Sequence, residues 1–243
     1  MSTPRIVFVT GTDTGVGKTT AAAGLLRAAT RLGRRVQAFK PVATGCSWQD
    51  GRLVSEDARL LKREAPLMRD DADVTAVAFE PAIAPHLAAA GAGIALSVAG
   101  LAQHCRSRIR AEADLVVVEG AGGWLVPLNR AETLADLCVA LDAAVVLVVG
   151  MRLGCINHAL LTAADVARRG LVLAGWIANV VDPGMAELAA NRRSLAERLP
   201  APCLGAIPFA PDDPVGTAAR HLDLSPLFGA QHGRLVRGSE AGS

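Results

Sequence analysis

The sequence predicts an α/β fold, with a single domain built on a mainly parallel sheet that has helices on both faces. Short runs rich in Val, Ile and Leu alternate with longer segments rich in Ala, Leu and Arg, which is typical of parallel strands joined by helices. Several runs are apolar at consecutive positions, as in strands covered on both faces. The 243 residues suffice for one domain with a full core. We assign this domain to residues 1–228 and expect residues 229–243, rich in Gly, Ser and charge, to form a flexible tail.

The composition disfavours several classes of protein. The 25 basic and 23 acidic residues leave a net charge of +2, and the basic residues are dispersed. Aromatic residues make up 3% of the chain, with no tyrosine, so we expect no nucleic-acid surface. Five widely spaced cysteines without a Cys-x-x-Cys pair indicate reduced thiols rather than a metal site or a disulfide framework. We find no signal peptide or membrane span, so we expect a cytoplasmic protein without membrane contact.

A glycine-rich loop after the first strand predicts a nucleotide site. A β-branched run at residues 6–9 leads into a loop with three glycines, which opens an Ala- and Leu-rich segment. Glycines let backbone N–H groups point at phosphates, Lys18 adds a positive charge, and the Thr19 hydroxyl is placed to bind Mg²⁺. This is a variant phosphate loop of the P-loop NTPase type, because five residues rather than four separate Gly11 from Gly17. The expected nucleotide contacts are Thr14, Gly15, Val16, Gly17, Lys18, Thr19 and Thr20.

The next two segments supply a second lysine. A helix is expected from Lys18 to about Leu32, followed by a strand at residues 35–39 that leads into Lys40. Ligands in open parallel sheets bind at the carboxyl ends of the strands, so Lys40 and Thr44 are predicted to face the phosphates. The alternative for Lys40 is a solvated lysine in a turn.

The middle of the chain offers an acidic candidate. Residues 46–54 have the composition of a surface loop, and Ser55 is a suitable cap for a helix whose first turn contains Asp57. On its own, this carboxylate is explained by the favourable interaction with the helix dipole. Residues 80–86 are interpreted as a loop entering a short helix, with His86 as either a structural or a functional residue.

A buried strand at residues 114–119 ends in Glu119, and small residues follow it. In phosphate-loop enzymes an acid at such a strand end assists Mg²⁺, and glycines there allow close approach to the phosphates. We therefore expect the nucleotide to lie against Gly120, Ala121 and Gly122 as well as Glu119.

Three later segments add further candidates. The strand at residues 143–149 leads into a helix that runs to about Arg169, and the free N–H groups at its start can bind an anion. A strand at residues 173–179 ends in Asn179, whose side-chain amide suits a base edge. The helix from about Met185 to Leu199 carries Asn191, and a last strand at residues 202–207 ends at Pro208, Phe209 and Ala210.

These observations predict a magnesium-dependent protein that uses ATP or GTP, and the absence of an Asn-Lys-x-Asp motif, which reads guanine, favours ATP.

Several motifs closely resemble those of the dethiobiotin synthetase family, in the same order over residues 6 to about 210. They are Gly-Thr-Asp-Thr-Gly-Val-Gly-Lys-Thr, Lys-Pro-Val-Ala-Thr-Gly, Glu-Gly-Ala-Gly-Gly-Trp, Leu-Gly-Cys-Ile-Asn-His, Ala-Gly-Trp-Ile-Ala-Asn and Gly-Ala-Ile-Pro.

The resemblance implies a cyclo-ligase of biotin biosynthesis that converts 7,8-diaminopelargonic acid, carbon dioxide and ATP to dethiobiotin, ADP and phosphate. It implies Lys18 and Lys40 at the phosphates and carbamate, with Thr19, Asp57 and Glu119 around Mg²⁺. It also implies a homodimer in which the loop at residues 153–157 meets the carboxylate of the partner's substrate. The remaining implied contacts are Thr44, Gly154, Cys155, Ile156, Asn157 and Asn191 for the substrate, and Asn179, Val180, Pro208, Phe209 and Ala210 for adenine.

Two positions depart from the resembled family. Gly15 stands where many members carry glutamate in the phosphate loop. Asn191 stands where the family has a tyrosine near the substrate carboxylate, so that contact is expected to be weaker or different.

The main alternative is a partitioning-type ATPase, a regulatory switch that dimerises around ATP. That group has a similar fold but carries a signature lysine five positions before the main lysine, where this chain has Asp13. An amidoligase of cobalamin synthesis would need a glutaminase domain, for which 243 residues leave no room.

Overall fold

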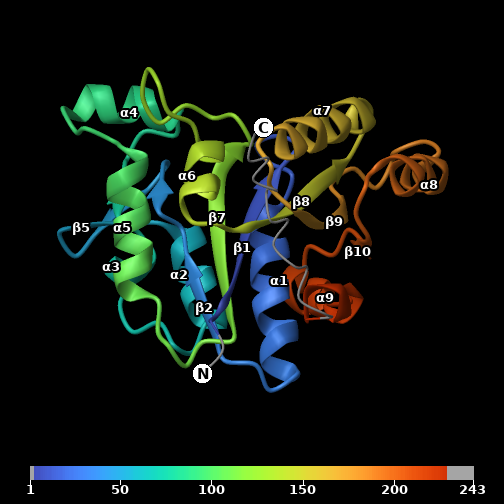
Figure 1. The fold of residues 1–243 in the computed structure, drawn as a ribbon, viewed down its shortest axis with the longest axis horizontal. Coiled ribbons are helices and arrows are strands. Elements are labelled where there is room, and N and C mark those ends of the chain that lie inside the picture. The colour runs from blue at the N-terminus through green and yellow to red at the C-terminus, as the bar shows by residue number, and fades with distance from the viewer. Residues whose placement is uncertain (1–2, 229–243) are drawn as a thin grey trace, which may run out of the picture.

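Figure 1 shows the computed structural model, which describes residues 3–228; residues 1–2 and the predicted tail at 229–243 lie outside the described residues. The described chain contains a six-stranded sheet in the order β10-β9-β8-β1-β7-β2, and all neighbouring pairs are parallel. Its strands are β1 (Arg5–Gly11), β2 (Val36–Phe39), β7 (Leu115–Gly123), β8 (Ala144–Met151), β9 (Leu173–Val180) and β10 (Cys203–Ile207). The predicted parallel sheet is confirmed.

Helices cover both faces of this sheet. They are α1 (Lys18–Arg31), α2 (Glu56–Glu64), α3 (Asp71–Val74), α4 (Pro85–Ala92), α5 (Val98–Arg108), α6 (Leu134–Ala140), α7 (Cys155–Arg168), α8 (Leu188–Arg198), α9 (Pro214–His221) and α10 (Ser225–Phe228). On one face, α1 contacts both α2 and α9. The connections through α6 and α7 cross the sheet in the opposite direction to the one through α1. Because such crossovers are right-handed, α6 and α7 lie on the other face.

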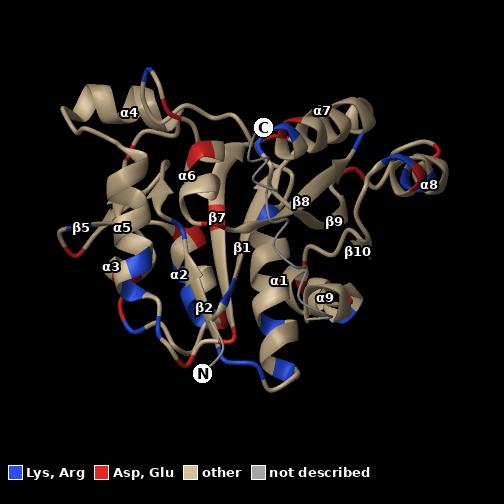
Figure 2. Cartoon of the chain, in the orientation of Figure 1, with Lys and Arg blue, Asp and Glu red and all other residues tan. Residues whose placement is uncertain are grey.

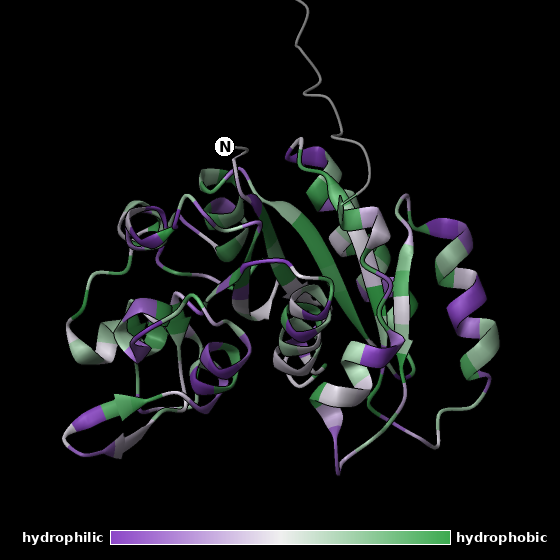
Figure 3. Ribbon diagram, turned by 90° about the horizontal axis from the view of Figure 1, so that it is seen from below, coloured by the Kyte–Doolittle hydropathy of each residue, from purple (hydrophilic) through white to green (hydrophobic). Residues whose placement is uncertain are grey.

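The central strands are buried because their side chains meet helices on both sides. Val7, Phe8 and Val9 of β1 are 0% exposed, as are the three valines that precede Glu119 in β7. Figure 3 shows these apolar strands as green ribbons between the flanking helices. Burial of consecutive residues explains why the strands have continuous apolar runs instead of alternating ones.

The strand register places the functional segments together. The phosphate loop leaves β1 at the same edge of the sheet at which β2 and β7 end, since all three strands are parallel. Phe39 of β2 is aligned with Val118 of β7, so the residues that follow them, Lys40 and Glu119, emerge side by side.

Two small pairings lie outside the main sheet. Residues 46–54, predicted as a loop, instead contain an antiparallel hairpin of β4 (Ser47–Gln49) and β5 (Arg52–Val54). Its turn residues Asp50 and Gly51 have φ of 48° and 72°, the left-handed conformations that a tight two-residue hairpin needs. The prediction of a loop there was wrong. A second pair joins β3 (Val42–Ala43) to β6 (Val77–Ala78) in parallel.

The surface is mixed in charge. Figure 2 shows basic and acidic residues on many elements, with both signs on α8. Within residues 3–228, no helix is long and apolar enough to cross a membrane.

Candidate active site

The phosphate loop joins β1 to α1 and has two residues in left-handed conformation. Gly15 has φ 73° and Gly17, the N-cap of α1, has φ 79°. A Cβ atom on Gly17 would lie 2.2 Å from Asn179 Nδ2, so a larger residue would displace the Asn179 side chain. No side chain caps α1, and the N–H groups of its first turn are therefore available to an anion.

Two buried lysines lie close together here: Lys18 at the end of the phosphate loop and Lys40 directly after β2. Lys40 Nζ donates to Glu119 Oε1 at 2.6 Å, to Asp57 Oδ2 at 3.0 Å and to the Gly120 carbonyl oxygen at 3.3 Å. The exposed fraction of Lys40 is 5% and that of Lys18 is 6%. Lys40 is thus a buried, hydrogen-bonded cation at the cavity, and the alternative of a solvated turn lysine is wrong.

Oxygen atoms gather around these cations. Thr19 Oγ1 donates to Glu119 Oε1 at 2.8 Å, whereas Glu119 Oε2 is buried and has no hydrogen-bond partner within the described residues. Asp57 lies in the first turn of α2, and Ser55 caps this helix by accepting from the Ala58 N–H at 3.2 Å, as predicted. Two carboxylates and a hydroxyl are the oxygen ligands that Mg²⁺ prefers.

Residues 3–228 contain no group of three or more His, Cys, Asp or Glu side chains arranged to hold a metal ion. The expected Mg²⁺ ligands, Thr19, Asp57 and Glu119, thus include only two carboxylates, and one of their oxygens, the buried Oε2 of Glu119, has no hydrogen-bond partner within the described residues.

Burial and charge give the two lysines different protonation behaviour. Burial, together with the nearby charge of Lys40, lowers the pKa of Lys18 to about 8, against the opposing effect of the carboxylates. Burial also acts to lower the pKa of Lys40, but Glu119 and Asp57 more than offset it, and that pKa is raised. Burial acts to raise the pKa of Asp57, and Lys40 outweighs it, so this pKa is lowered. The Lys40–Asp57 pair is therefore charged at neutral pH.

A cavity of about 700 Å³ opens over this cluster. The predicted residues that line it are Thr14, Gly15, Gly17, Lys18, Thr19, Thr20, Lys40, Thr44, Asp57, Glu119, Ala121 and Gly122. Sequence reasoning missed a further group of lining residues, namely Ala82, Ile83, Ala84, Pro85 and Val126. The first four precede or begin α4. The predicted loop that enters a helix here was a signal that this segment could form a cavity wall. The segment was missed because these side chains are not ionisable.

A second cavity of about 290 Å³ shares Gly15 and Thr20 with the first. Its lining includes the residues expected at adenine, namely Asn179, Val180, Pro208, Phe209 and Ala210. The Asn179 amide nitrogen donates to the Val16 carbonyl at 2.9 Å. This side chain therefore supports the phosphate loop as well as lining the cavity.

Two predicted residues lie behind the cavities. Val16 is 0% exposed, and Gly120 contributes its carbonyl oxygen to Lys40. A Cβ atom on Gly120 would lie 3.1 Å from the Phe8 ring. Both residues shape the site from beneath rather than lining it.

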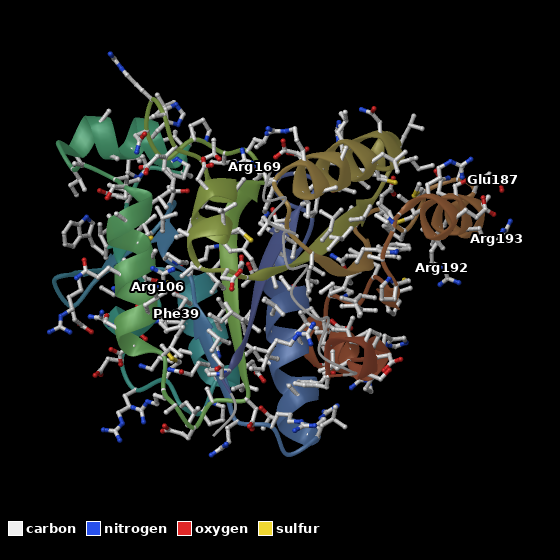
Figure 4. All side chains as sticks on the ribbon, viewed as in Figure 1. Phe39, Arg106, Arg169, Glu187, Arg192 and Arg193 are labelled. Atoms are coloured by element: carbon white, nitrogen blue, oxygen red, sulfur yellow. The ribbon has the colours of Figure 1, made fainter. Side chains whose placement is uncertain are left out.

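The predicted substrate residues in the second half of the chain line neither cavity; they are Gly154, Cys155, Ile156, Asn157 and Asn191. The first four form the uncapped start of α7, beside Leu153, which is 97% exposed. Asn191 Nδ2 donates to the Glu187 carbonyl in its own helix at 3.0 Å. Figure 4 shows Glu187, Arg192 and Arg193 on α8 at the edge of the molecule.

Comparison with known proteins shows to which family this chain belongs. A family model described as an AAA domain matches residues 5–213. The "ATP-dependent dethiobiotin synthetase BioD" of Pseudomonas aeruginosa strain UCBPP-PA14 is 54% identical over 220 residues, which are 90% of this chain and 96% of that protein. The chain belongs to the dethiobiotin synthetase family.

Other family members agree over the same length. The dethiobiotin synthetase of Cellvibrio japonicus is 51% identical over 93% of this chain and 99% of its own. That of Xanthomonas campestris pv. campestris strain 8004 is 46% identical over 89% of this chain and 96% of its own. The described structure thus represents nearly the whole length of a dethiobiotin synthetase.

Solved structures share the fold at low identity. Chloroplast FtsY from Physcomitrella patens has a TM-score of 0.51 and 18% identity, covering 90% of this chain and 66% of that one. A chain of the MinC:MinD cell division protein complex from Aquifex aeolicus also has a TM-score of 0.51, with 17% identity, covering 89% of this chain and 85% of that one. These likenesses show that this chain and these proteins have the same fold.

Proposed function

We propose that this protein is an ATP-dependent dethiobiotin synthetase, a ligase that forms the two C–N bonds of a cyclic urea in biotin biosynthesis. Its substrates are 7,8-diaminopelargonate, carbon dioxide and ATP, and its products are dethiobiotin, ADP and phosphate. The observation that carries the proposal is the pair of buried lysines, Lys18 and Lys40, facing one cavity beside Glu119 and Asp57.

The cavity suits the charges that this reaction develops. One amine of the substrate attacks carbon dioxide and loses a proton, which gives a carbamate. A carbamate oxygen then attacks the γ-phosphorus and ADP departs; the second amine attacks the carbonyl carbon and phosphate departs. Negative charge accumulates on the carbamyl phosphate and on the phosphoryl group in transfer, where Lys18 and Lys40 stabilise it.

Magnesium is the cofactor that we propose for this site. Thr19, Asp57 and Glu119 would hold it, and the unpaired Glu119 Oε2 supports this assignment. When bound, the ion neutralises phosphate charge and orients the transferred group. Asp57 is half exposed and reaches the cavity from α2, so its role extends beyond the helix dipole.

The second cavity is the proposed adenine site. Its walls are largely apolar, and Phe209 is 53% exposed there, which leaves a ring face for the base. One N–H of the Asn179 amide donates to the Val16 carbonyl, so its second N–H and its carbonyl oxygen would be left to donate to and accept from the base. Thr44, which lines the first cavity but not the second, is the proposed contact for the diamine.

We also propose a homodimer. The start of α7, residues 154–157, presents uncapped backbone N–H groups next to the fully exposed Leu153. These groups would bind the carboxylate of the partner's substrate, and Asn191 would lie near it. The five cysteines are free thiols, which supports a cytoplasmic location in a reducing compartment.

Phosphate release from ATP, measured with and without diaminopelargonate and bicarbonate, tests the proposal. A dethiobiotin synthetase releases phosphate in proportion to dethiobiotin formed, and only when both additions and Mg²⁺ are present. A partitioning-type switch would hydrolyse ATP without the diamine, and that outcome would overturn the proposal. Chelation of Mg²⁺ is expected to stop the coupled reaction.

A further inference from the structure

An ion pair links the phosphate loop to the strand next to it. Asp13, in the loop, pairs with Arg152, which directly follows β8. The two side chains are 47% and 44% exposed. The Asp13 carboxylate also accepts from the Thr14 N–H at 2.7 Å, and Lys18 Nζ donates to the Asp13 carbonyl oxygen at 3.1 Å. A carboxylate is thus built into a loop whose function is to bind polyanionic phosphates.

Asp13 lies next to the lysine of the loop. Lys18 Nζ contacts its backbone carbonyl oxygen, and the Asp13 charge is the smallest of the charges that act to raise the pKa of Lys18. A carboxylate in this loop opposes the binding of phosphates there. The loop tolerates the carboxylate because its Oδ1 atom makes a local turn with Thr14, a contact that an asparagine could make as well.

The segments joined by the ion pair are already held together without it. The Thr12 N–H donates to the Val148 carbonyl at 3.0 Å, and the Gly150 N–H donates to Thr12 Oγ1 at 3.4 Å. A Cβ atom on Gly150 would lie 2.7 Å from Val16, so the end of β8 is in direct contact with the loop. Arg152 is therefore not needed to keep β8 and the loop in place.

We infer that Arg152 is a positioning residue for ATP that acts through Asp13: it neutralises the Asp13 carboxylate, which would otherwise repel the phosphates. The inference rests on the proposed function only in that ATP binds at this loop. The inference goes beyond the proposed function because Arg152 belongs neither to the phosphate-loop motif nor to the lining of the first cavity.

Equilibrium binding of ATP, measured by calorimetry without the diamine, tests this inference in a double-mutant cycle. Arg152→Gln is expected to weaken ATP binding about fivefold to tenfold, because one uncompensated charge then acts across a partly exposed site. The double variant Asp13→Asn with Arg152→Gln is expected to bind within about twofold of the parent, since the unpaired charge is gone. Arg152→Lys keeps the cation and should bind like the parent.

A matched control and a salt series separate this role from a structural one. Arg198→Gln removes an exposed arginine that pairs with Glu197 on α8, and it should leave ATP binding unchanged. The defect of Arg152→Gln should shrink as ionic strength rises, because salt screens exposed charges. All variants should share the parent's unfolding midpoint within a few degrees.

Two outcomes would overturn the inference. One is parent-like ATP binding by Arg152→Gln at low salt; the other is a double variant that binds as weakly as Arg152→Gln. Because the readout needs no ring closure, a parent protein that binds ATP but makes no dethiobiotin would contradict the proposed function and leave this inference intact.

Discussion

Lys40 and Glu119 form an ion pair whose two side chains are buried in the folded protein. The exposed fractions of their side chains are 6% and 0%, and their atoms lie 2.6 Å apart. Loss of one partner leaves the other charge buried and uncompensated, which costs about 3 to 5 kcal/mol. The pair therefore affects stability as well as chemistry.

We predict that Lys40→Ala lowers the free energy of unfolding by about 3 to 5 kcal/mol and slows turnover about a hundred- to a thousandfold. Urea unfolding and coupled phosphate release measure the two effects. Lys62→Ala is the control: Lys62 pairs with Asp71 at the surface, with both side chains partly exposed, and such pairs contribute at most about 1 kcal/mol. Unfolding of Lys40→Ala at the parent's urea concentration would contradict the prediction.

Lys18 gives ATP binding a defined pH dependence. Its pKa is about 8 in the folded protein, below its usual value, because burial disfavours the charged form. The unfolded chain therefore binds more protons than the folded one above about pH 8. The free energy of unfolding then rises with pH toward the ordinary pKa of lysine, because the cost of burying this charged group falls. Bound phosphates favour the charged form, so ATP binding above about pH 8 should take up a proton.

Calorimetry in buffers of different ionisation enthalpy measures this proton uptake. At about pH 9 we expect uptake approaching one proton per ATP bound, and at about pH 7 close to none from this group. Lys18→Met should abolish the difference between the two pH values. Equal uptake by the parent at both would show that Lys18 stays charged in the free protein.

The sequence predicts the residues of this cluster better than their contacts. Lys18, Thr19 and Glu119 follow from the loop and from a strand that ends in an acid. Asn179 illustrates the limit: its amide donates to Val16, 163 positions away, and no local pattern encodes such a contact. Asn191 likewise turns its donor to Glu187 in its own helix, a choice between rotamers that residue type alone does not decide.

At the scale of elements, the phosphate loop offers a matched pair of glycines. Gly15 and Gly17 have nearly the same positive φ, so alanine at either position costs about 1 to 2 kcal/mol of backbone strain. A Cβ atom on Gly15 meets nothing within 4 Å, whereas one on Gly17 collides with the Asn179 amide. The two substitutions thus differ in one steric contact.

We predict that Gly15→Ala binds ATP within about threefold of the parent, whereas Gly17→Ala loses more than about tenfold, which corresponds to at least about 1.4 kcal/mol relative to the parent. The loss arises because Asn179 must leave both the Val16 carbonyl and its place in the second cavity, the proposed adenine site. Equilibrium ATP binding measures both variants. Equal losses would mean that strain, and not the displacement of Asn179, decides the outcome.

Elements with strong local signals were predictable, and elements that depend on short turn sequences were missed. The helix from Lys18 ends at Arg31, one residue from the predicted end. The hairpin of β4 and β5 was missed although Asp50-Gly51 is a known two-residue turn signal. Helix α9 was missed too, despite the capping Asp213 before Pro214. Both elements are short, at most eight residues for α9, and periodicity is a weak signal over so few residues.

At the scale of the whole molecule, the proposed dimer depends on an exposed apolar side chain. Leu153 is 97% exposed, beside the start of α7. Full burial of a leucine contributes about 1.5 to 3 kcal/mol, and a charge there would be desolvated in the interface. Burial of Leu153 in a second copy would therefore stabilise the assembly.

We predict that Leu153→Glu shifts the protein from dimer to monomer in sedimentation equilibrium and raises the diamine KM, while ATP binding stays within about twofold. Leu32→Glu is the control, because Leu32 is 62% exposed at the end of α1, far along the chain from the proposed interface. A fully active monomer, whether parent or variant, would refute a substrate site shared between subunits.

The tryptophans give this protein a built-in optical signal. With no tyrosine and three tryptophans, its ultraviolet emission comes from indole rings in contrasting surroundings. Trp48 is 61% exposed on the β4–β5 hairpin, whereas Trp124 and Trp176 are 4% and 0% exposed. Trp124 follows Gly122 and Gly123, meets the Phe8 ring edge-on at 6.3 Å and donates to Asp165 at 2.8 Å. It lies between Gly122 and Val126, which both line the first cavity, so we expect its fluorescence to report nucleotide binding without an added dye, and replacing the exposed Trp48 removes the water-exposed background.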